Sequence, residues 1–63
     1  MPIVEISLVE GRTPEKKAEL IREVTNAVQR TLGSRASDIR VVLRDIPKGN
    51  LGVGGEVYIP EKL

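Results

Sequence analysis

The chain has 63 residues, of which 40% are hydrophobic, and its formal net charge is +1. A domain this short buries only about 60% of the surface that it exposes when unfolded, so small domains usually add disulfides, a metal or a partner subunit. The sequence contains no Cys and no His. It therefore excludes disulfides, the usual zinc sites, Cys nucleophiles and Ser-His-Asp triads, and self-association remains as the way to complete the core.

The balance of charged and aromatic residues argues against nucleic acid as a partner. Ten Lys and Arg face nine Asp and Glu, and Tyr58 is the single aromatic residue, so neither a basic patch nor a base-stacking surface is expected. No apolar run approaches the ~20 residues of a membrane span, and residues 1–12 lack the features of a secretory signal peptide. We expect one cytoplasmic domain over residues 1–63, with no membrane partner.

The first predicted element is a strand over residues 3–9, which is rich in β-branched side chains. Because side chains alternate along a strand, Val4, Ile6 and Leu8 share one face. The opposite face mixes apolar and polar residues, which predicts partial burial.

The second predicted element is a helix over residues 14–32. Thr13 is a suitable N-cap, Pro14 suits the first helical position, and Gly33 suits a left-handed C-cap. The helix carries one apolar stripe at helical spacing, formed by Leu20, Ile21, Val24, Ala27, Val28, Thr31 and Leu32. Lys16 and Lys17 are expected on its solvent-exposed face.

Shorter elements are predicted for the remaining half of the chain. Residues 33–38 form a loop with one helical turn, and residues 39–46 form a second strand. A turn at 47–50 and a Gly-rich segment at 51–55 follow, and a short strand is expected at 57–59.

The order strand, long helix, strand predicts a right-handed parallel β-α-β unit of the α/β (α+β) class, with a short C-terminal hairpin or tail. One helix covers a single face of a two-stranded sheet, so the other face and both edges stay open. Two such units side by side form a four-stranded sheet with two helices.

Pro2 is the first candidate for chemistry. Initiator Met is commonly removed before a small second residue, which gives Pro2 a free secondary amine. An α-amine titrates near ~7.7–8.0, which suits a base that works at neutral pH. The alternative interpretation is that Pro2 merely begins a strand, where its missing N–H costs nothing.

Several motifs together resemble one family. Pro2 precedes a β-branched strand, E-G-R stands at 10–12, I-R-V-V at 39–42, and K-G-N-L-G-V-G-G-E at 48–56. This pattern covers nearly the whole chain and resembles the 4-oxalocrotonate tautomerase (2-hydroxymuconate tautomerase) family of the tautomerase superfamily.

The resemblance implies β-α-β protomers that assemble as homohexamers, as trimers of dimers. It also implies an isomerase that interconverts the enol and keto forms of a small unsaturated 2-hydroxy (di)acid such as 2-hydroxymuconate, in aromatic hydrocarbon catabolism. Pro2 is then the general base and, later in the reaction, the general acid. No metal and no organic cofactor is implied.

By the same resemblance, Arg12 binds the distal carboxylate of the substrate, and Arg40 holds the 2-oxygen and the near carboxylate. Arg pairs with carboxylate through a bidentate fork, and cations near the enolate oxygen stabilise charge that develops in the transition state. Leu8 and Leu51 are further candidate substrate-binding residues. In the family these groups come from neighbouring subunits, so no monomer is expected to contain a complete site.

Two features leave alternatives open. Leu51 stands where the family usually has Phe, Trp or Tyr, and it cannot stack on a conjugated substrate. If Met1 stays attached, the Pro2 nitrogen is an amide and cannot act as a base. The alternatives are a non-catalytic oligomeric relative, a Pro2-dependent enzyme with another substrate, and Pro2 acting as a nucleophile on a carbonyl.

Each arginine also has an interpretation without a catalytic role. Arg12 is then a loop residue in water, and Arg40 forms an ion pair on the sheet, for example with Asp45. Arg35 and Arg44 are expected to be solvated or interfacial.

Overall fold

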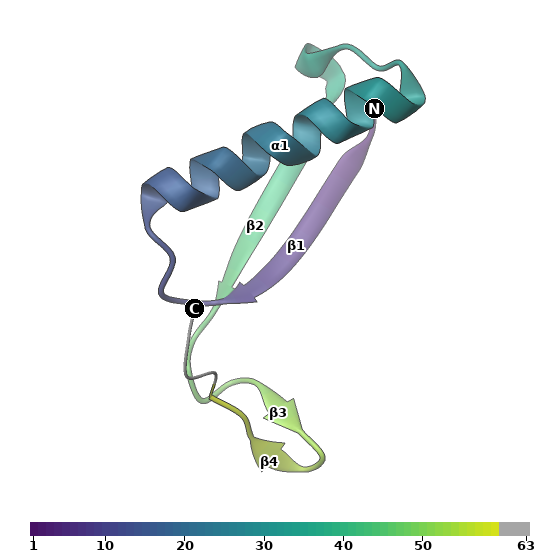
Figure 1. The fold of residues 1–63 in the computed structure, drawn as a ribbon. Coiled ribbons are helices and arrows are strands. Elements are labelled where there is room, and N and C mark those ends of the chain that lie inside the picture. Colours follow the sequence, from purple (N-terminus) through teal and green to yellow (C-terminus); the bar gives the residue numbers. More distant parts are fainter. Residues whose placement is uncertain (60–63) are drawn as a thin grey trace.

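The computed structural model describes residues 1–59 of the chain. Figure 1 shows the elements in chain order. They are β1 (Ile3–Val9), α1 (Pro14–Leu32), the short 3-10 helix η1 (Ala36–Asp38), β2 (Arg40–Ile46), β3 (Gly52–Val53) and β4 (Glu56–Val57). This is the predicted β-α-β protomer with a short hairpin after the second long strand.

β1 and β2 form a two-stranded parallel sheet in which Ile3 lies opposite Arg40 and Val9 lies opposite Ile46. Parallel strands need a long crossover connection, and α1 supplies it. Figure 1 shows α1 running alongside the strand pair, with the β3–β4 hairpin beyond the carboxyl end of β2. The sheet therefore has one face beneath a helix, while its other face and its outer edges are open in the single chain.

Both ends of α1 follow the local chemistry of the sequence. The Thr13 hydroxyl oxygen accepts a hydrogen bond from the backbone N–H of Lys16 at 3.2 Å, and Pro14 occupies the first turn. Gly33 adopts a left-handed conformation with φ 70°, and its N–H donates to the Gln29 carbonyl at 3.0 Å. The caps satisfy backbone groups that a helix otherwise leaves without partners, so they fix where the helix begins and ends.

Burial alternates over residues 3–8 of β1, and on the face predicted to be partly buried only Val9 is buried in the single chain. Val4, Ile6 and Leu8 are half-buried beneath α1, whereas Ile3 on the opposite face is 60% exposed. Along α1 no residue is fully buried, and Leu32 of the predicted apolar stripe is 66% exposed. The helix therefore covers the sheet without closing a core around it.

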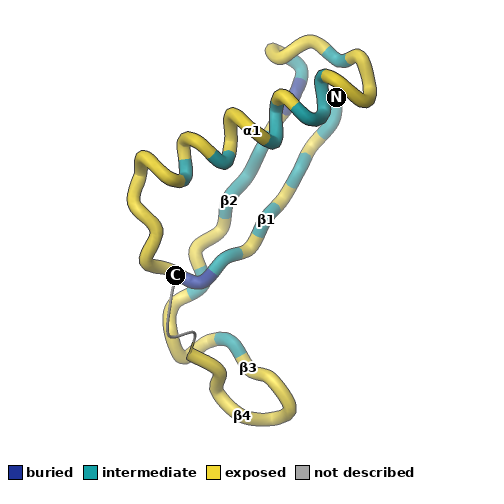
Figure 2. The backbone as a smooth tube through the Cα atoms, in the orientation of Figure 1, coloured by how far each residue is buried: buried dark blue, intermediate teal, exposed yellow. Residues whose placement is uncertain are grey.

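Among residues 1–59, only Val9 and Ile39 are buried. Figure 2 shows the two buried segments at opposite ends of the strand pair. The single chain exposes 4846 Å² of surface, whereas a folded monomer of this size exposes roughly 4,000 Å². Its radius of gyration is 14.2 Å, against roughly 11 Å for a compact domain of this length. The excess surface indicates that the packing of the single chain is incomplete and that a neighbouring subunit would complete it.

The C-terminal hairpin differs in detail from the expected short strand at 57–59. β4 comprises Glu56–Val57 and pairs antiparallel with β3, so Tyr58 and Ile59 lie beyond the strand. Gly54 and Gly55 form the connecting turn with φ 62° and 88°, a conformation in which glycine carries no steric penalty. The Gly-rich segment thus makes a tight turn. No helix within residues 1–59 combines the length and apolarity needed to cross a membrane.

Candidate active site

Pro2 and Arg40 lie together where the two parallel strands begin. The Pro2 carbonyl accepts a hydrogen bond from the Arg40 backbone N–H at 3.0 Å, and Pro2 itself is half-buried. The Arg40 guanidinium is exposed, and its Nη1 donates to the Ser37 carbonyl at 2.7 Å. The backbone of β2 therefore holds the residue that precedes β1. The Arg40 side chain instead contacts η1, through the Ser37 carbonyl.

Arg12 lies at the other end of β1, just before the helix. The turn at Gly11 has φ 128°, which favours glycine, and it leads from the strand into Arg12. Arg12 Nη1 donates to the Val9 carbonyl at 3.1 Å, and the residue as a whole is exposed. The guanidinium has further N–H donors in its fork that are able to bind an anion.

The length of β1 separates the two arginines that the sequence singles out. β1 has seven residues, so its ends lie about 20 Å apart at the usual rise of a strand. Arg40 is beside Pro2 at the beginning of β1, and Arg12 follows its end. One chain therefore does not bring Pro2, Arg40 and Arg12 into a single site.

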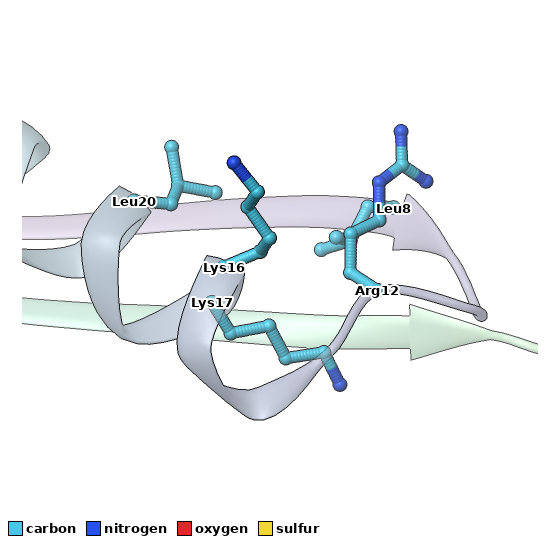
Figure 3. Close-up of a pocket in the computed structure, with 5 residues that line it drawn as sticks. All are labelled: Leu8, Arg12, Lys16, Lys17 and Leu20. Carbon is cyan, nitrogen blue, oxygen red and sulfur yellow. The ribbon is translucent and has the colours of Figure 1, made fainter.

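A hollow of about 440 Å³ opens beside Arg12, between the end of β1 and the first turns of α1. Figure 3 shows the side chains that line it, which are Leu8, Arg12, Lys16, Lys17 and Leu20. Two leucines supply apolar surface and three cations surround it. A hollow of this composition suits a small anion with a hydrocarbon body.

The lysines of the hollow differ in their partners. The Lys17 ammonium pairs with the Asp45 carboxylate of β2, and its side chain is 28% exposed. The expectation that Lys17 is simply a surface lysine is therefore wrong, because this ion pair draws its side chain over the sheet. The Lys16 side chain is 74% exposed, as expected, and its ammonium lies 3.7 Å from Glu19.

Leu51 lies apart from this hollow. It is half-buried and directly precedes β3, and its carbonyl accepts from the Tyr58 N–H at 2.8 Å across the base of the hairpin. The preceding loop is tied to the end of β1, because the Lys48 N–H donates to Glu10 Oε2 at 2.9 Å. Within one chain, Leu51 lines a different surface from the one that Leu8 and Arg12 share.

The remaining arginines of the second half have acidic neighbours in the chain. Arg44 Nη2 lies 3.1 Å from Glu5 Oε1 on the open face of the sheet, and Arg35 lies 3.6 Å from Asp38. The ion pair considered for Arg40 with Asp45 is not formed, since Asp45 pairs with Lys17. Within the described residues, no cluster of three or more His, Cys, Asp or Glu side chains is placed to hold a metal ion.

Sequence reasoning assigned no site role to three residues that line the hollow, which are Lys16, Lys17 and Leu20. A signal for Lys16 and Leu20 was available. They are four positions apart, so they fall on one side of α1, which begins two residues after Arg12.

Comparisons with known proteins agree with this fold along nearly the whole chain. The family model described as tautomerase enzyme matches residues 2–58. A 2-hydroxymuconate tautomerase of Pseudomonas putida is 44% identical over 57 residues, which are 90% of this chain and 90% of that protein.

Solved structures give the same result. A 4-oxalocrotonate tautomerase homologue has a TM-score of 0.85 and 37% identity, with 90% of each chain covered. The heterohexameric 4-oxalocrotonate tautomerase of Chloroflexus aurantiacus has a TM-score of 0.85 and 30% identity, covering 90% of this chain and 92% of that one. Since sequence and fold agree from residue 2 to residue 58, the chain belongs to the tautomerase family and is a tautomerase-like isomerase.

Proposed function

We propose that this chain catalyses the enol–keto tautomerisation of a small unsaturated 2-hydroxy dicarboxylic acid such as 2-hydroxymuconate. The observation that carries the proposal is the position of Pro2. It directly precedes β1, is half-buried, and accepts a hydrogen bond through its carbonyl from the backbone N–H of Arg40. The identity of 44% to a 2-hydroxymuconate tautomerase supports the choice of substrate class.

In the proposed reaction, the free amine of Pro2 removes the proton from the 2-hydroxyl group of the dienol, after Met1 has been removed. The oxygen becomes a carbonyl, and the electron pair moves along the conjugated chain. The protonated proline then returns its proton to a carbon further along that chain. Atoms and charge balance without any co-reactant, and Pro2 ends in the state in which it began.

The arginines supply the electrostatic part of the proposal. Arg40 holds the near carboxylate and the 2-oxygen, where negative charge develops, and Arg12 holds the distal carboxylate. Preformed donors aimed at developing charge lower the barrier because they need no reorganisation during the reaction. Leu8 and Leu51 line the path of the hydrocarbon chain and keep water away from the amine.

Self-association is part of the same proposal. Pro2 precedes β1 and Arg12 follows it, and the ends of β1 lie about 20 Å apart, so a site that uses both takes Arg12 from another copy. A homohexamer, built as a trimer of dimers, also accounts for the open sheet face and for the exposed apolar side chains of Ile3, Val53 and Val57. A related structure, at 30% identity, is a heterohexamer, which supports this assembly class.

Replacing Pro2 tests the proposal directly. Pro2→Ala keeps a free α-amine but loses the secondary amine and its fixed ring, so ketonisation of 2-hydroxymuconate is expected to slow by about 100-fold or more. Circular dichroism and sedimentation must match the parent protein, since the Pro2 carbonyl bond to Arg40 does not need the ring. Full activity in this folded variant would refute the requirement for a secondary amine at residue 2, and a parent protein inactive towards this substrate would refute the substrate.

A further inference from the structure

We propose that Lys16 is a specificity-determining residue that favours ligands with a carboxylate at their distal end. The inference rests on the proposed function and deepens it, because it adds a second cation to the hollow beside Arg12. Lys16 and Arg12 line the same hollow of about 440 Å³, together with the apolar side chains of Leu8 and Leu20.

Lys16 is chosen over Lys17 because of their different partners. Lys17 pairs with Asp45, so its charge is neutralised locally. In the view of Figure 3, the Lys17 ammonium points towards β2, whereas the Lys16 ammonium and the Arg12 guanidinium both point away from β2, past β1. Of the two lysines, Lys16 is thus the one placed to add its charge to that of Arg12.

The contact between Lys16 and Glu19 is weak enough to leave the ammonium available. The two groups lie 3.7 Å apart, and their side chains are 74% and 53% exposed. Exposed pairs of this kind contribute little, because water screens the charges and both side chains lose freedom. A carboxylate that also bonds to Arg12 competes with Glu19 for the ammonium.

The cations of the hollow, and not its apolar part, set the discrimination between the two kinds of ligand. Leu8 and Leu20 offer surface to the hydrocarbon chain of a ligand, whatever its terminus. A distal carboxylate then pairs with Arg12 and Lys16, whereas a methyl group at the same place displaces water from two cations and gives them no partner. The hollow therefore selects the dicarboxylate over the monocarboxylate of the same chain length.

Two stable acids form a matched pair of probes. trans,trans-Muconate is a six-carbon diene with two carboxylates, and sorbate is the same diene with a methyl group in place of one carboxylate. Their dissociation constants, measured by titration calorimetry on the full chain, give a preference ratio. This ratio needs no turnover, so it is independent of whether 2-hydroxymuconate is the substrate.

Lys16→Gln keeps a good helix former at an exposed position and removes the charge. It is expected to lower the preference for muconate by about two- to fivefold, the range for one exposed ion pair, with sorbate affinity unchanged. Arg22→Gln, which removes the same charge from an exposed position of α1 outside the hollow, is the matched control and leaves the ratio unchanged. Glu19→Gln is expected to raise the ratio, because it removes the competing carboxylate.

An unchanged ratio in folded Lys16→Gln, an equal loss in Arg22→Gln, or no preference for muconate in the parent protein would each overturn the inference. The proposed function fails separately, through absent turnover of 2-hydroxymuconate while the Lys16-dependent preference for muconate persists.

Discussion

The Pro2 carbonyl accepts the backbone N–H of Arg40 at 3.0 Å, so the first residue of the candidate site is held by the main chain of β2. This bond begins the parallel ladder that continues with Ile3 opposite Arg40. The Arg40 guanidinium takes no part in it and instead donates to the Ser37 carbonyl. Removing the Arg40 side chain therefore leaves the position of Pro2 intact, which makes a clean test of the guanidinium possible.

Arg40→Ala is expected to lower kcat/KM for 2-hydroxymuconate by about 100-fold or more, the usual loss when one donor to a developing oxyanion is removed. Steady-state ketonisation assays measure the effect. Arg44→Ala is the control, because Arg44 lies on the same strand and pairs with Glu5. Equal losses in both variants would mean that general electrostatics, and not the assigned contact of Arg40, drives the effect.

Arg12→Ala is expected to raise KM by about tenfold to a hundredfold, which is the cost of losing a hydrogen-bonded charge on the substrate carboxylate. A smaller fall in kcat is expected as well, because the proton returns to a carbon further along the conjugated chain, towards the distal carboxylate that Arg12 holds. Assays over a wide range of substrate concentration separate the two constants. An unchanged KM would remove Arg12 from its assigned role.

Local sequence signals predicted most of the secondary structure. The alternation along residues 3–9 and the Thr13, Pro14 and Gly33 signals have local causes, and β1 and α1 have the predicted bounds. The second strand begins at Arg40 and not at residue 39, because the Ile39 N–H donates back to the Ala36 carbonyl of η1. At the C-terminus, the hairpin turn at Gly54 and Gly55 decides the pairing, and it brings β4 forward to Glu56–Val57.

The candidate site was harder to predict from the sequence, because it depends on which residues, distant along the chain, the fold brings together. The ion pair of Lys17 with Asp45 joins residues 28 positions apart, so no local sequence pattern predicts it. Arg12 and Lys16 line one hollow, but Arg12 precedes α1, so their proximity becomes evident only once the end of β1 is placed beside the first turns of α1.

The next prediction concerns the number of chains in the assembly. Sedimentation equilibrium is expected to yield the proposed hexamer. The single chain exposes 4846 Å² and leaves Ile3, Val53 and Val57 in contact with solvent, which favours association. Unfolding should depend on protein concentration, because association stabilises only the folded chains. A stable and active monomer would contradict the argument that the site is shared between copies.

Substitution of Gly33 is expected to change the stability of the protein and not its activity. Gly33→Ala places a Cβ in the left-handed conformation at φ 70°, which costs about 1–2 kcal/mol, although nothing lies within 4 Å of the new atom. Thermal unfolding at fixed protein concentration should show a lower midpoint. Gly33→Asn is expected to lose less, because Asn tolerates this conformation better. Equal midpoints for Gly33→Ala and the parent would show that the C-cap conformation contributes nothing measurable.

The free amine of Pro2 is the proposed base, and one comparison tests this role without changing any residue of the site. The same protein is prepared with Met1 removed and with Met1 retained, each state established by intact mass, and ketonisation of 2-hydroxymuconate is followed by ultraviolet absorbance. With Met1 attached the Pro2 nitrogen is an amide, so turnover should follow the fraction of chains that lack Met1. Equal turnover by the two preparations would contradict the account.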